Sequence, residues 1–205
     1  MNEKIFFGRS RIRKVSKIKK KNFEIFQKKY PISKIKKTKL ILEIGFGMGE
    51  NVIELSQRNK NKKIIGIEPL LNGQYFLADY CLKNNINNVL IYTEPAQIFI
   101  SVFKKFIFDS IYILFPDPWH KKKHKKRRLL NKEFVKKIVL KSKKIYFLSD
   151  NFDYFSNILQ ITKNLLQKKK IISFSTKKFK IAKTKYLNRA KKLNKRLYFL
   201  TIDIS

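Results

Sequence analysis

Short apolar runs that alternate with amphipathic segments constrain the fold of this chain more than any other feature. The first run, LILEIGFG, ends in glycines, and the segment after it, ENVIELSQRN, has apolar residues at helical spacing. The same order returns with the apolar runs KIIGIEP, NVLIYTE, DSIYILF and KIYFLSD. Strands that alternate with helices of about 10–16 residues build βαβ units and a mostly parallel sheet. The sequence therefore predicts an α/β fold.

The two ends of the chain depart from this alternation. Residues 1–37 are basic and weakly periodic, so we expect an N-terminal arm with one short helix around NFEIFQKKY, residues 22–30. The folded domain is predicted over residues 38–205. Its last two predicted strands, KIISFST and RLYFLTIDI, have no helix of useful length between them and are expected to pair antiparallel at one edge of the sheet.

The charge of the chain is strongly unbalanced, because 49 Lys and Arg face 14 Asp and Glu for a formal net charge of +35. Such a field attracts polyanions, most often nucleic acid. The alternative is a solvated lysine-rich surface that reflects an AT-rich genome. That alternative accounts for Lys in place of Arg, but not for the excess of basic over acidic residues.

Cysteine content and hydropathy exclude several classes of protein. The single cysteine, Cys81, forms no intramolecular disulfide and no cysteine-based zinc site, and its apolar-periodic segment predicts a core position. No apolar stretch of about 18 residues and no signal-peptide pattern is present. We expect a cytoplasmic protein with no membrane contact, no bound metal and no obligate protein partner.

Acidic residues follow or end four of the predicted strands: Glu43, Glu68, Asp117 and Asp150. Ligands of open parallel sheets bind outside the carboxyl ends of the strands. Each acid taken alone is equally compatible with a helix cap or a surface charge. Four acids at equivalent strand ends predict a ligand site.

The first of these ends carries a glycine-rich turn, EIGFGMGE, with Gly45, Gly47 and Gly49. Its G-x-G-x-G spacing differs from the G-x-G-x-x-G of dinucleotide-binding folds. Glu68 suits two ribose hydroxyls, which both NAD and S-adenosylmethionine possess. Because Glu43 is better placed beside a cationic ligand than beside a pyrophosphate, the pattern favours S-adenosylmethionine, which carries sulfonium and ammonium groups.

The segment FPDPWHKKKHKKRR places one acid, Asp117, between two prolines and ahead of a basic run. Proline fixes its own φ and biases the preceding residue toward extended backbone, so Asp117 is expected on a stiff turn. Trp119 offers a flat surface for packing or base stacking. The basic segment, residues 120–128, is suited to RNA phosphates, and a carboxylate can accept from the adjacent N1–H and N2–H₂ donors of guanine.

FPDPWHKKKHKKRRLL resembles the signature of the bacterial tRNA (guanine-N7)-methyltransferase family, and LEIGFGMGE, GIEP and LSDNFDYF resemble its further motifs in the same order. The resemblance covers roughly residues 39–190. It implies a Rossmann-like class I methyltransferase fold, with a mostly parallel sheet and an antiparallel edge strand. It also implies methyl transfer from S-adenosylmethionine to N7 of a variable-loop guanosine of tRNA, position 46 in the tRNA convention.

The resemblance also implies roles for single residues. Asp117 is the implied catalytic acid and also lies near the cofactor. The other implied cofactor residues are Glu43, Gly45, Gly47, Gly49, Glu68 and Glu94, and the implied tRNA contacts are Lys121, Asp150, Thr184, Lys185, Tyr186 and Arg189. The chain departs from the family pattern twice. Leu187 stands where the family has Glu, and Pro95 takes the position of an Asp, for which Glu94 is the candidate substitute.

Two other functions remain open from the sequence. One is methylation of an exocyclic amine, although those enzymes carry a D-P-P-[YW]-like turn and this chain has PDPW. The other is a basic RNA-binding protein of the same fold with reduced or lost activity, which the changes at Leu187 and Pro95 suggest. Cofactor binding distinguishes the second alternative from an enzyme.

Overall fold

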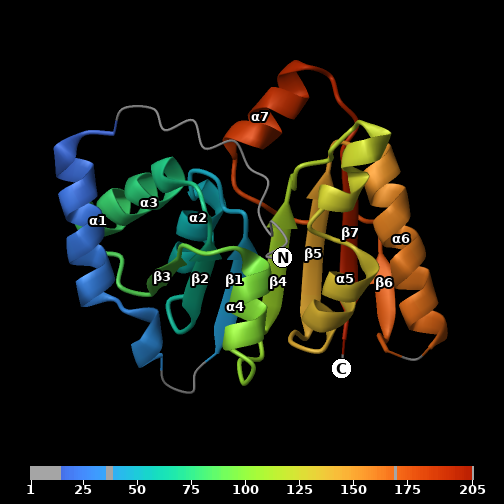
Figure 1. The fold of residues 1–205 in the computed structure, drawn as a ribbon, viewed down its shortest axis with the longest axis horizontal. Coiled ribbons are helices and arrows are strands. Elements are labelled where there is room, and N and C mark those ends of the chain that lie inside the picture. The colour runs from blue at the N-terminus through green and yellow to red at the C-terminus, as the bar shows by residue number, and fades with distance from the viewer. Residues whose placement is uncertain (1–14, 36–38, 169, 205) are drawn as a thin grey trace. The chain divides into compact units, whose positions relative to one another are not determined.

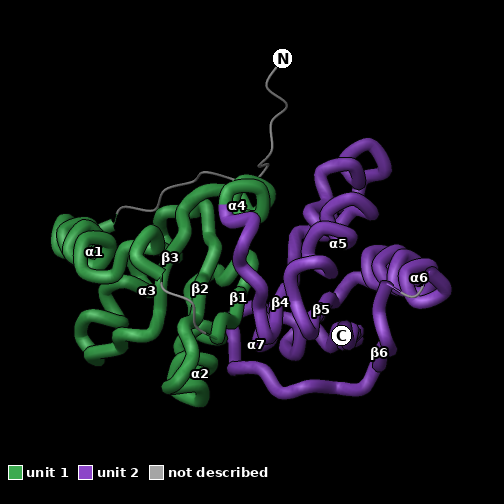
Figure 2. The backbone as a smooth tube through the Cα atoms, turned by 90° about the horizontal axis from the view of Figure 1, so that it is seen from below, with its two compact units in different colours: residues 1–102 green, residues 103–205 purple. Residues whose placement is uncertain are grey.

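The computed structural model describes residues 15–35, 39–168 and 170–204. The chain divides into two compact units, residues 1–102 and residues 103–205, which Figure 2 colours separately. Each unit carries its own strands and helices and is described by itself.

Unit 1 contains three parallel strands in the order β3-β2-β1, each followed along the chain by a helix (Figure 1). This is the predicted βαβ alternation. Helices α2 and α4 lie on opposite sides of the strands (Figure 2), which is why all five residues of β1 are buried. The elements are β1 (Leu40–Ile44), α2 (Glu50–Arg58), β2 (Lys63–Ile67), α3 (Leu71–Lys83), β3 (Val89–Tyr92) and α4 (Ala96–Val102).

Ahead of β1, the predicted helix of the basic N-terminal region is present as α1 (Lys17–Lys29), followed by the short 3₁₀ helix η1 (Ile32–Lys34). Helix α1 runs beside α3 (Figure 1). It packs on α3 through Phe23, whose ring centre lies 5.2 Å from that of Tyr75, and through Asn22, whose Nδ2 donates to Asp79 Oδ1 at 2.6 Å. The predicted boundary between arm and domain falls at residues 36–38, outside the described residues, and residues 1–14 of the arm lie outside them too.

Unit 2 contains four strands in the order β4-β5-β7-β6. Strands β4 and β5 are parallel, and β7 is antiparallel to both β5 and β6. The predicted antiparallel pairing of the last two strands is therefore confirmed. The elements are β4 (Ser110–Leu114), η2 (Lys122–Arg127), α5 (Lys132–Val139), β5 (Lys144–Ser149), α6 (Phe152–Gln167), β6 (Ser173–Ser175), α7 (Lys185–Lys192) and β7 (Tyr198–Asp203).

One prediction about unit 2 is wrong, because a helix does lie between the last two strands. Helix α7 has the sequence KYLNRAKK, in which only Leu187 and Ala190 are buried. Two buried apolar residues in a segment rich in lysine give too little hydrophobic periodicity for the helix to be recognised from the sequence. Its start is instead marked by Thr184, whose Oγ1 accepts from the backbone N–H of Leu187 at 3.1 Å.

Cys81 lies in the core of unit 1, as predicted, with no exposed surface. Burial raises the pKa of its thiol to about 12, so the thiol stays protonated and is not a nucleophile at neutral pH. No helix within the described part of the chain is both long and apolar enough to cross a membrane.

Candidate functional site

Glu43 is a buried carboxyl group inside a strand. It lies in β1 beside Gly66 of β2, with 2% of its surface exposed, and Asn51 Nδ2 donates to its Oε2 at 2.9 Å. Burial raises the pKa of Glu43 to about 8, although the hydrogen bond from Asn51 lowers the pKa. The acid is therefore largely neutral at pH 7, and a cationic group beside it would favour its ionised form.

Glu43→Gln is expected to stabilise the protein increasingly as the pH rises from 5 to 8. The folded-state pKa of Glu43 lies above the unfolded value of 4.5, so the wild type loses stability once the unfolded chain ionises, at about 1.4 kcal/mol per pH unit until the folded-state pKa is passed. Urea unfolding at pH 5 and pH 8 measures the effect. The matched control is Glu133→Gln on the exposed face of α5, which makes the same chemical change without burial. An equal response of the two variants would contradict the raised pKa.

The glycine-rich turn after β1 takes the backbone through the left-handed region. Gly45, Gly47 and Gly49 have φ values of +74°, +60° and +87°. In these conformations a side chain is strained, so glycine is strongly favoured. The turn ends at Gly49, the N-cap of α2, whose N–H donates to Phe46 O at 2.9 Å. The tight turn that the three glycines predicted is present.

Glu68 is fixed by this turn. Its Oε2 accepts from the Gly47 N–H at 2.9 Å, and its Oε1 accepts from the Leu70 N–H at 3.0 Å. Glu68 follows β2 directly and is 7% exposed. A carboxylate has about four acceptor positions, so this orientation is compatible with further bonds from ligand hydroxyls.

The start of α3 contributes polar residues that the sequence analysis did not identify. Gln74 Nε2 donates to Glu68 O at 2.6 Å, while Gln74 Oε1 and Asn72 Oδ1 are buried without a hydrogen-bond donor among the described residues. Buried acceptors of this kind normally have a partner. They fit a ligand rich in hydroxyl and ammonium donors, as S-adenosylmethionine is. The only signal in the sequence was the position of these amides just after the acid of β2.

Glu94 is exposed and follows β3 by two residues. It lies at the carboxyl end of the strand beside β2, and its charge contributes, after burial, to the raised pKa of Tyr92. Pro95 begins the next turn, where its carbonyl accepts from Ile98 N at 3.0 Å. The carboxylate of Glu94 therefore occupies an equivalent strand end to Glu68, and its contact with a cofactor remains a prediction.

In unit 2, the Phe115–Trp119 turn carries the acid between the two prolines. Its first and last residues have φ values of +51° and +45°. The expectation of extended backbone before proline is wrong for Phe115, because a hydrogen bond from its N–H to Leu148 O at 2.8 Å anchors the residue where β4 ends. Left-handed non-glycine residues cost about 1–3 kcal/mol each and persist only where the surrounding structure imposes them.

Arg128 braces this turn from within the protein. Its Nε donates to Pro118 O at 2.8 Å, its Nη2 pairs with Asp153 Oδ2 at 2.5 Å, and its guanidinium lies 4.7 Å from the centre of the Tyr154 ring. Arg128 is only 6% exposed. The expectation that the whole basic segment faces RNA phosphates is therefore wrong for Arg128, whose charge is used to hold the turn.

Asp117 itself is exposed, yet the surrounding protein desolvates its carboxyl group and raises its pKa. Within the described ranges it forms no hydrogen bond or ion pair, although the chain carries a large excess of cations. In contrast, Asp150, which follows the neighbouring strand β5, pairs with Lys195 Nζ at 2.7 Å. The strained turn thus keeps one carboxylate available at the end of β4.

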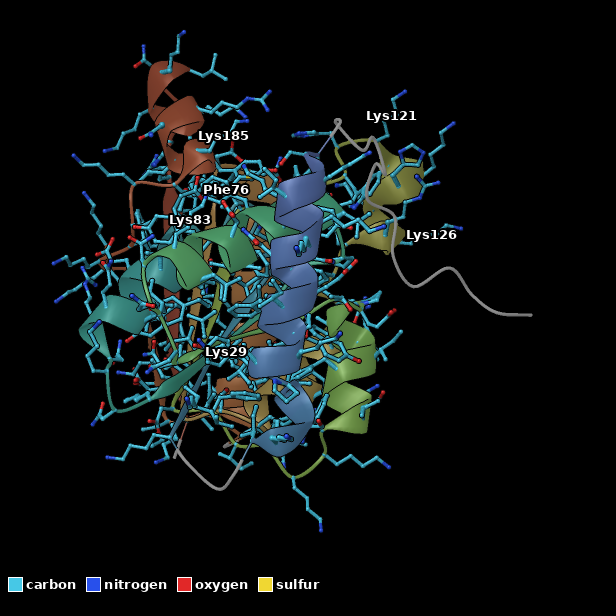
Figure 3. All side chains as sticks on the ribbon, turned by 90° about the vertical axis from the view of Figure 1, so that its left-hand side faces the viewer. Lys29, Phe76, Lys83, Lys121, Lys126 and Lys185 are labelled. Carbon is cyan, nitrogen blue, oxygen red and sulfur yellow. The ribbon has the colours of Figure 1, made fainter. Side chains whose placement is uncertain are left out.

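The basic segment follows this turn along the chain, and its lysines are exposed, at residues 121–123, 125 and 126. Lys125 pairs with Asp153 at 2.8 Å. Figure 3 shows Lys121 and Lys126 extending outward from the η2 region. Trp119 packs inside the segment, with the Arg127 guanidinium 5.1 Å from its ring centre and the His124 ring edge-on at 5.9 Å. His120 Nδ1 lies 3.2 Å from Asn151 Nδ2. These contacts support the packing interpretation of the tryptophan.

Helix α7 brings the predicted C-terminal contacts toward the same strand ends. Helices η2 and α7 both lie beyond the carboxyl ends of β4 and β5 (Figure 1), and the Tyr186 ring stacks on Phe115 with centres 6.3 Å apart. Lys185 and Arg189 are exposed on α7, whereas Thr184 is buried and caps the helix. Tyr186 therefore lies beside the turn of Asp117, and contact with RNA by these residues remains a prediction.

No cluster of three or more His, Cys, Asp or Glu side chains with metal-binding geometry occurs in the part of the chain that the structure describes.

Comparison with known proteins relates these features to methyltransferases. A family model described as "Putative methyltransferase" matches residues 37–200. The "Bifunctional methyltransferase" of Rickettsia conorii is 40% identical over 140 residues, which are 65% of this chain but 27% of that protein. The "tRNA (guanine-N(7)-)-methyltransferase" of Wolbachia pipientis is 33% identical over 209 residues, which are 97% of this chain and 91% of that protein. The chain thus spans about a quarter of the Rickettsia relative and nearly all of the Wolbachia relative.

Solved structures show the same fold. Precorrin-6y C5,15-methyltransferase from Geobacter metallireducens is similar with a TM-score of 0.57 and 15% identity, over 98% of this chain and 94% of that chain. At this identity the likeness concerns the fold alone. The predicted Rossmann-like class I methyltransferase fold, with a mostly parallel sheet and an antiparallel edge, is confirmed.

Proposed function

Because this chain belongs to the tRNA (guanine-N7)-methyltransferase family, we propose that it transfers a methyl group from S-adenosylmethionine to N7 of a variable-loop guanosine, position 46, in tRNA. The observation that carries the proposal is Asp117. It is a carboxylate without an ion pair among the described residues, held on a strained turn at a strand end, beside a segment of exposed lysines.

Unit 1 supplies residues that suit the cofactor. Bound S-adenosylmethionine provides an electrophilic methyl group on a sulfonium. Glu68, oriented by two backbone donors, accepts from the ribose hydroxyls, and Glu43 places an acid near the cationic part of the ligand. The left-handed glycines let the backbone approach closely, and Glu94 takes the place of the family's Asp at the third strand end.

The methyl transfer requires that the guanine be oriented and does not require a general base. N7 of guanine has a lone pair and carries no proton, so methyl transfer forms the N7–carbon bond as the sulfur–carbon bond breaks, and no proton is removed. Asp117 accepts from N1–H and N2–H₂ of the guanine. The purine becomes positive as the cofactor product becomes a neutral thioether, and the negative charge of Asp117 stabilises this change.

The tRNA is held by charge around this acid. Lys121 is exposed and lies four residues after Asp117 in the sequence. The exposed face of α7 carries Lys185, Tyr186 and Arg189. Asp150 pairs with Lys195, and Thr184 caps the backbone of α7. We propose that Asp150 and Thr184 hold these segments in position and contact the RNA only at the edge of its binding surface. We propose a cytoplasmic location, which a tRNA substrate supports.

A related RNA-binding protein without activity is not favoured as the function. Such a protein needs no buried acid in β1, no left-handed glycine turn and no orphaned amide acceptors at the start of α3. Methylation of an exocyclic amine is also disfavoured, since Asp117 has a proline on each side.

The experiment that tests the function combines purified protein, an unmodified tRNA transcript with a variable-loop guanosine and methyl-labelled S-adenosylmethionine. After digestion, label is expected in N7-methylguanosine. The control transcript carries adenosine in place of that guanosine and should stay unlabelled. Label in an N2-methylated guanosine or in another nucleoside would refute the assignment, and tight tRNA binding without any label would support the binding-only alternative.

A further inference from the structure

An apolar pocket lies within unit 2, beside α7 and β7. Its volume is about 250 Å³. The side chains that line it divide into two kinds, an apolar floor and a rim of exposed lysines. The floor is Phe179, Ile181, Leu187, Leu197 and Phe199, and the rim is Lys178, Lys180, Lys183 and Lys191.

The floor of the pocket is held in place by aromatic packing. Phe179 contacts Phe199 edge-on with ring centres 5.2 Å apart, and it contacts Tyr146 at 4.9 Å. Phe179 packs on the core cluster of Leu114, Leu148 and Phe199, and so does Phe115 at the turn of Asp117. The pocket is therefore preformed and connects through packed side chains to the turn.

The rim of the pocket favours anions. No acidic side chain lines it, and none of the four lysines forms an ion pair with any residue that the structure describes. Uncompensated lysines around an apolar floor match a group that is flat and apolar at its centre and anionic at its edge. A nucleotide has this chemistry, because a base stacks on aromatic or apolar side chains while its phosphates take the lysines.

Leu187 makes the floor of the pocket apolar in this chain. It is 7% exposed and lines the floor, at the position where the family pattern has Glu. A glutamate there would bring negative charge among the four lysines and remove apolar surface from the floor. The change to leucine thus converts this site into one that favours an apolar group beside phosphates.

We propose that this pocket binds one base of the tRNA substrate, a neighbour of the methylated guanosine, while the rim lysines bind the phosphates on either side of that base. The inference rests on the proposed function for the identity of the RNA. The described residues that line the pocket include no carboxylate to read the donors of guanine. The target base therefore goes to Asp117, and the pocket anchors a second nucleotide whatever its sequence. Its volume is below the roughly 300 Å³ at which sites for whole small molecules begin, which suits a single base.

The test measures tRNA affinity with transcripts that each lack one base near the target guanosine. One abasic position should weaken binding to the wild type about tenfold, the scale of one stacked base. Leu187→Phe, which fills the pocket, should weaken binding of intact tRNA to the same extent and remove the effect of that abasic position. Lys183→Gln with Lys191→Gln should lower the salt dependence of binding by about 0.7–0.9 for each phosphate that is no longer neutralised.

The controls separate the pocket from fold and from general charge. Lys163→Gln on α6 removes one exposed charge that does not line the pocket, and it should leave the abasic effect unchanged. Affinity for S-adenosylhomocysteine should be the same in every variant, because none of the changed residues belongs to the proposed cofactor site. Should Leu187→Phe fail to fold, the exposed lysine pair still reports on the rim, and Ile181→Phe fills the floor from another position.

Two results would overturn the inference. In the first, every abasic transcript loses the same affinity with the wild type as with the filled variant. In the second, the wild type binds adenosine monophosphate, Leu187→Phe prevents that binding, and abasic tRNAs bind as tightly as intact tRNA. The occupant of the pocket would then be a free nucleotide. Both readouts are binding affinities. A wild type that binds tRNA through the pocket but forms no N7-methylguanosine would refute the proposed function and leave the pocket standing.

Discussion

Asp117→Asn is expected to lower the single-turnover rate of tRNA methylation by at least about tenfold, a barrier increase of about 1.4 kcal/mol. The asparagine keeps the shape of the side chain, but it has one acceptor oxygen in place of two and carries no charge to stabilise the cationic purine. The rate is measured by rapid quench with saturating tRNA and labelled cofactor. Affinity for S-adenosylhomocysteine should change little, because asparagine keeps the shape of the side chain and the proposed ribose contacts are made by Glu68.

The pH dependence of the same rate gives an independent check. Desolvation raises the pKa of Asp117, so its ionised form is lost at a higher pH than for an ordinary aspartate as the solution is acidified. The wild-type rate should fall through that pKa, and the asparagine variant should lack the fall. The matched control is Asp109→Asn at the opposite end of β4, where Asp109 pairs with Lys143. An Asp117→Asn rate equal to that of the wild type would remove Asp117 from the mechanism.

Gly73→Ala is expected to destabilise unit 1 by about 1–3 kcal/mol or more and to abolish measurable binding of S-adenosylhomocysteine. Within a helix, alanine is normally more stabilising than glycine by about 0.5–1 kcal/mol. At Gly73 we expect the opposite, a loss of stability. The reason is a close approach. A Cβ at Gly73 would collide with the carbonyl oxygen of Gly47 and lie 3.2 Å from Glu68 Cγ, which forces α3 away from the glycine turn.

Gly45→Ala is the matched control for the effect of this collision on stability; its ligand affinity is not a control, because Gly45 is itself a proposed cofactor residue. A Cβ at Gly45 meets no atom within 4 Å, so the variant has only the cost of a left-handed backbone, about 1–2 kcal/mol. Urea unfolding compares the two variants, and calorimetry with S-adenosylhomocysteine compares Gly73→Ala with the wild type. If Gly73→Ala were as stable as the wild type and bound the ligand equally, the contact between α3 and the glycine turn would not support the cofactor site.

The positions of the strands and of the acids at their ends could be predicted from the sequence. Each parallel strand is a short apolar run bounded by glycine or by an acid, and burial on both faces of the sheet leaves little alternative for such a run. The acids Glu68 and Asp150 then follow from where these runs end. The glycine spacing of EIGFGMGE likewise predicted a tight turn, and the three glycines do take the left-handed backbone that favours glycine.

Contacts between segments distant along the chain could not be predicted in the same way. The sequence placed Arg128 in a basic run of nine residues, and nothing local distinguishes it from its neighbours. Only the fold brings Asp153 and the Pro118 carbonyl to its guanidinium. In the same way, the left-handed Phe115 contradicts its local preference before proline, because a backbone bond to β5 and stacking with Tyr186 outweigh that preference.

The fold class, the family and the residues proposed to carry the chemistry could all be inferred from the amino-acid sequence, because hydrophobic periodicity and motif spacing are local properties of the chain. Which charges remain available depends on the folded protein. It uses Arg128, Asp150 and Thr184 to hold the structure, and it leaves Asp117 without an ion pair among the described residues. Ion pairing and desolvation depend on distances in space, which residues 10 to 45 positions apart acquire only when the chain folds.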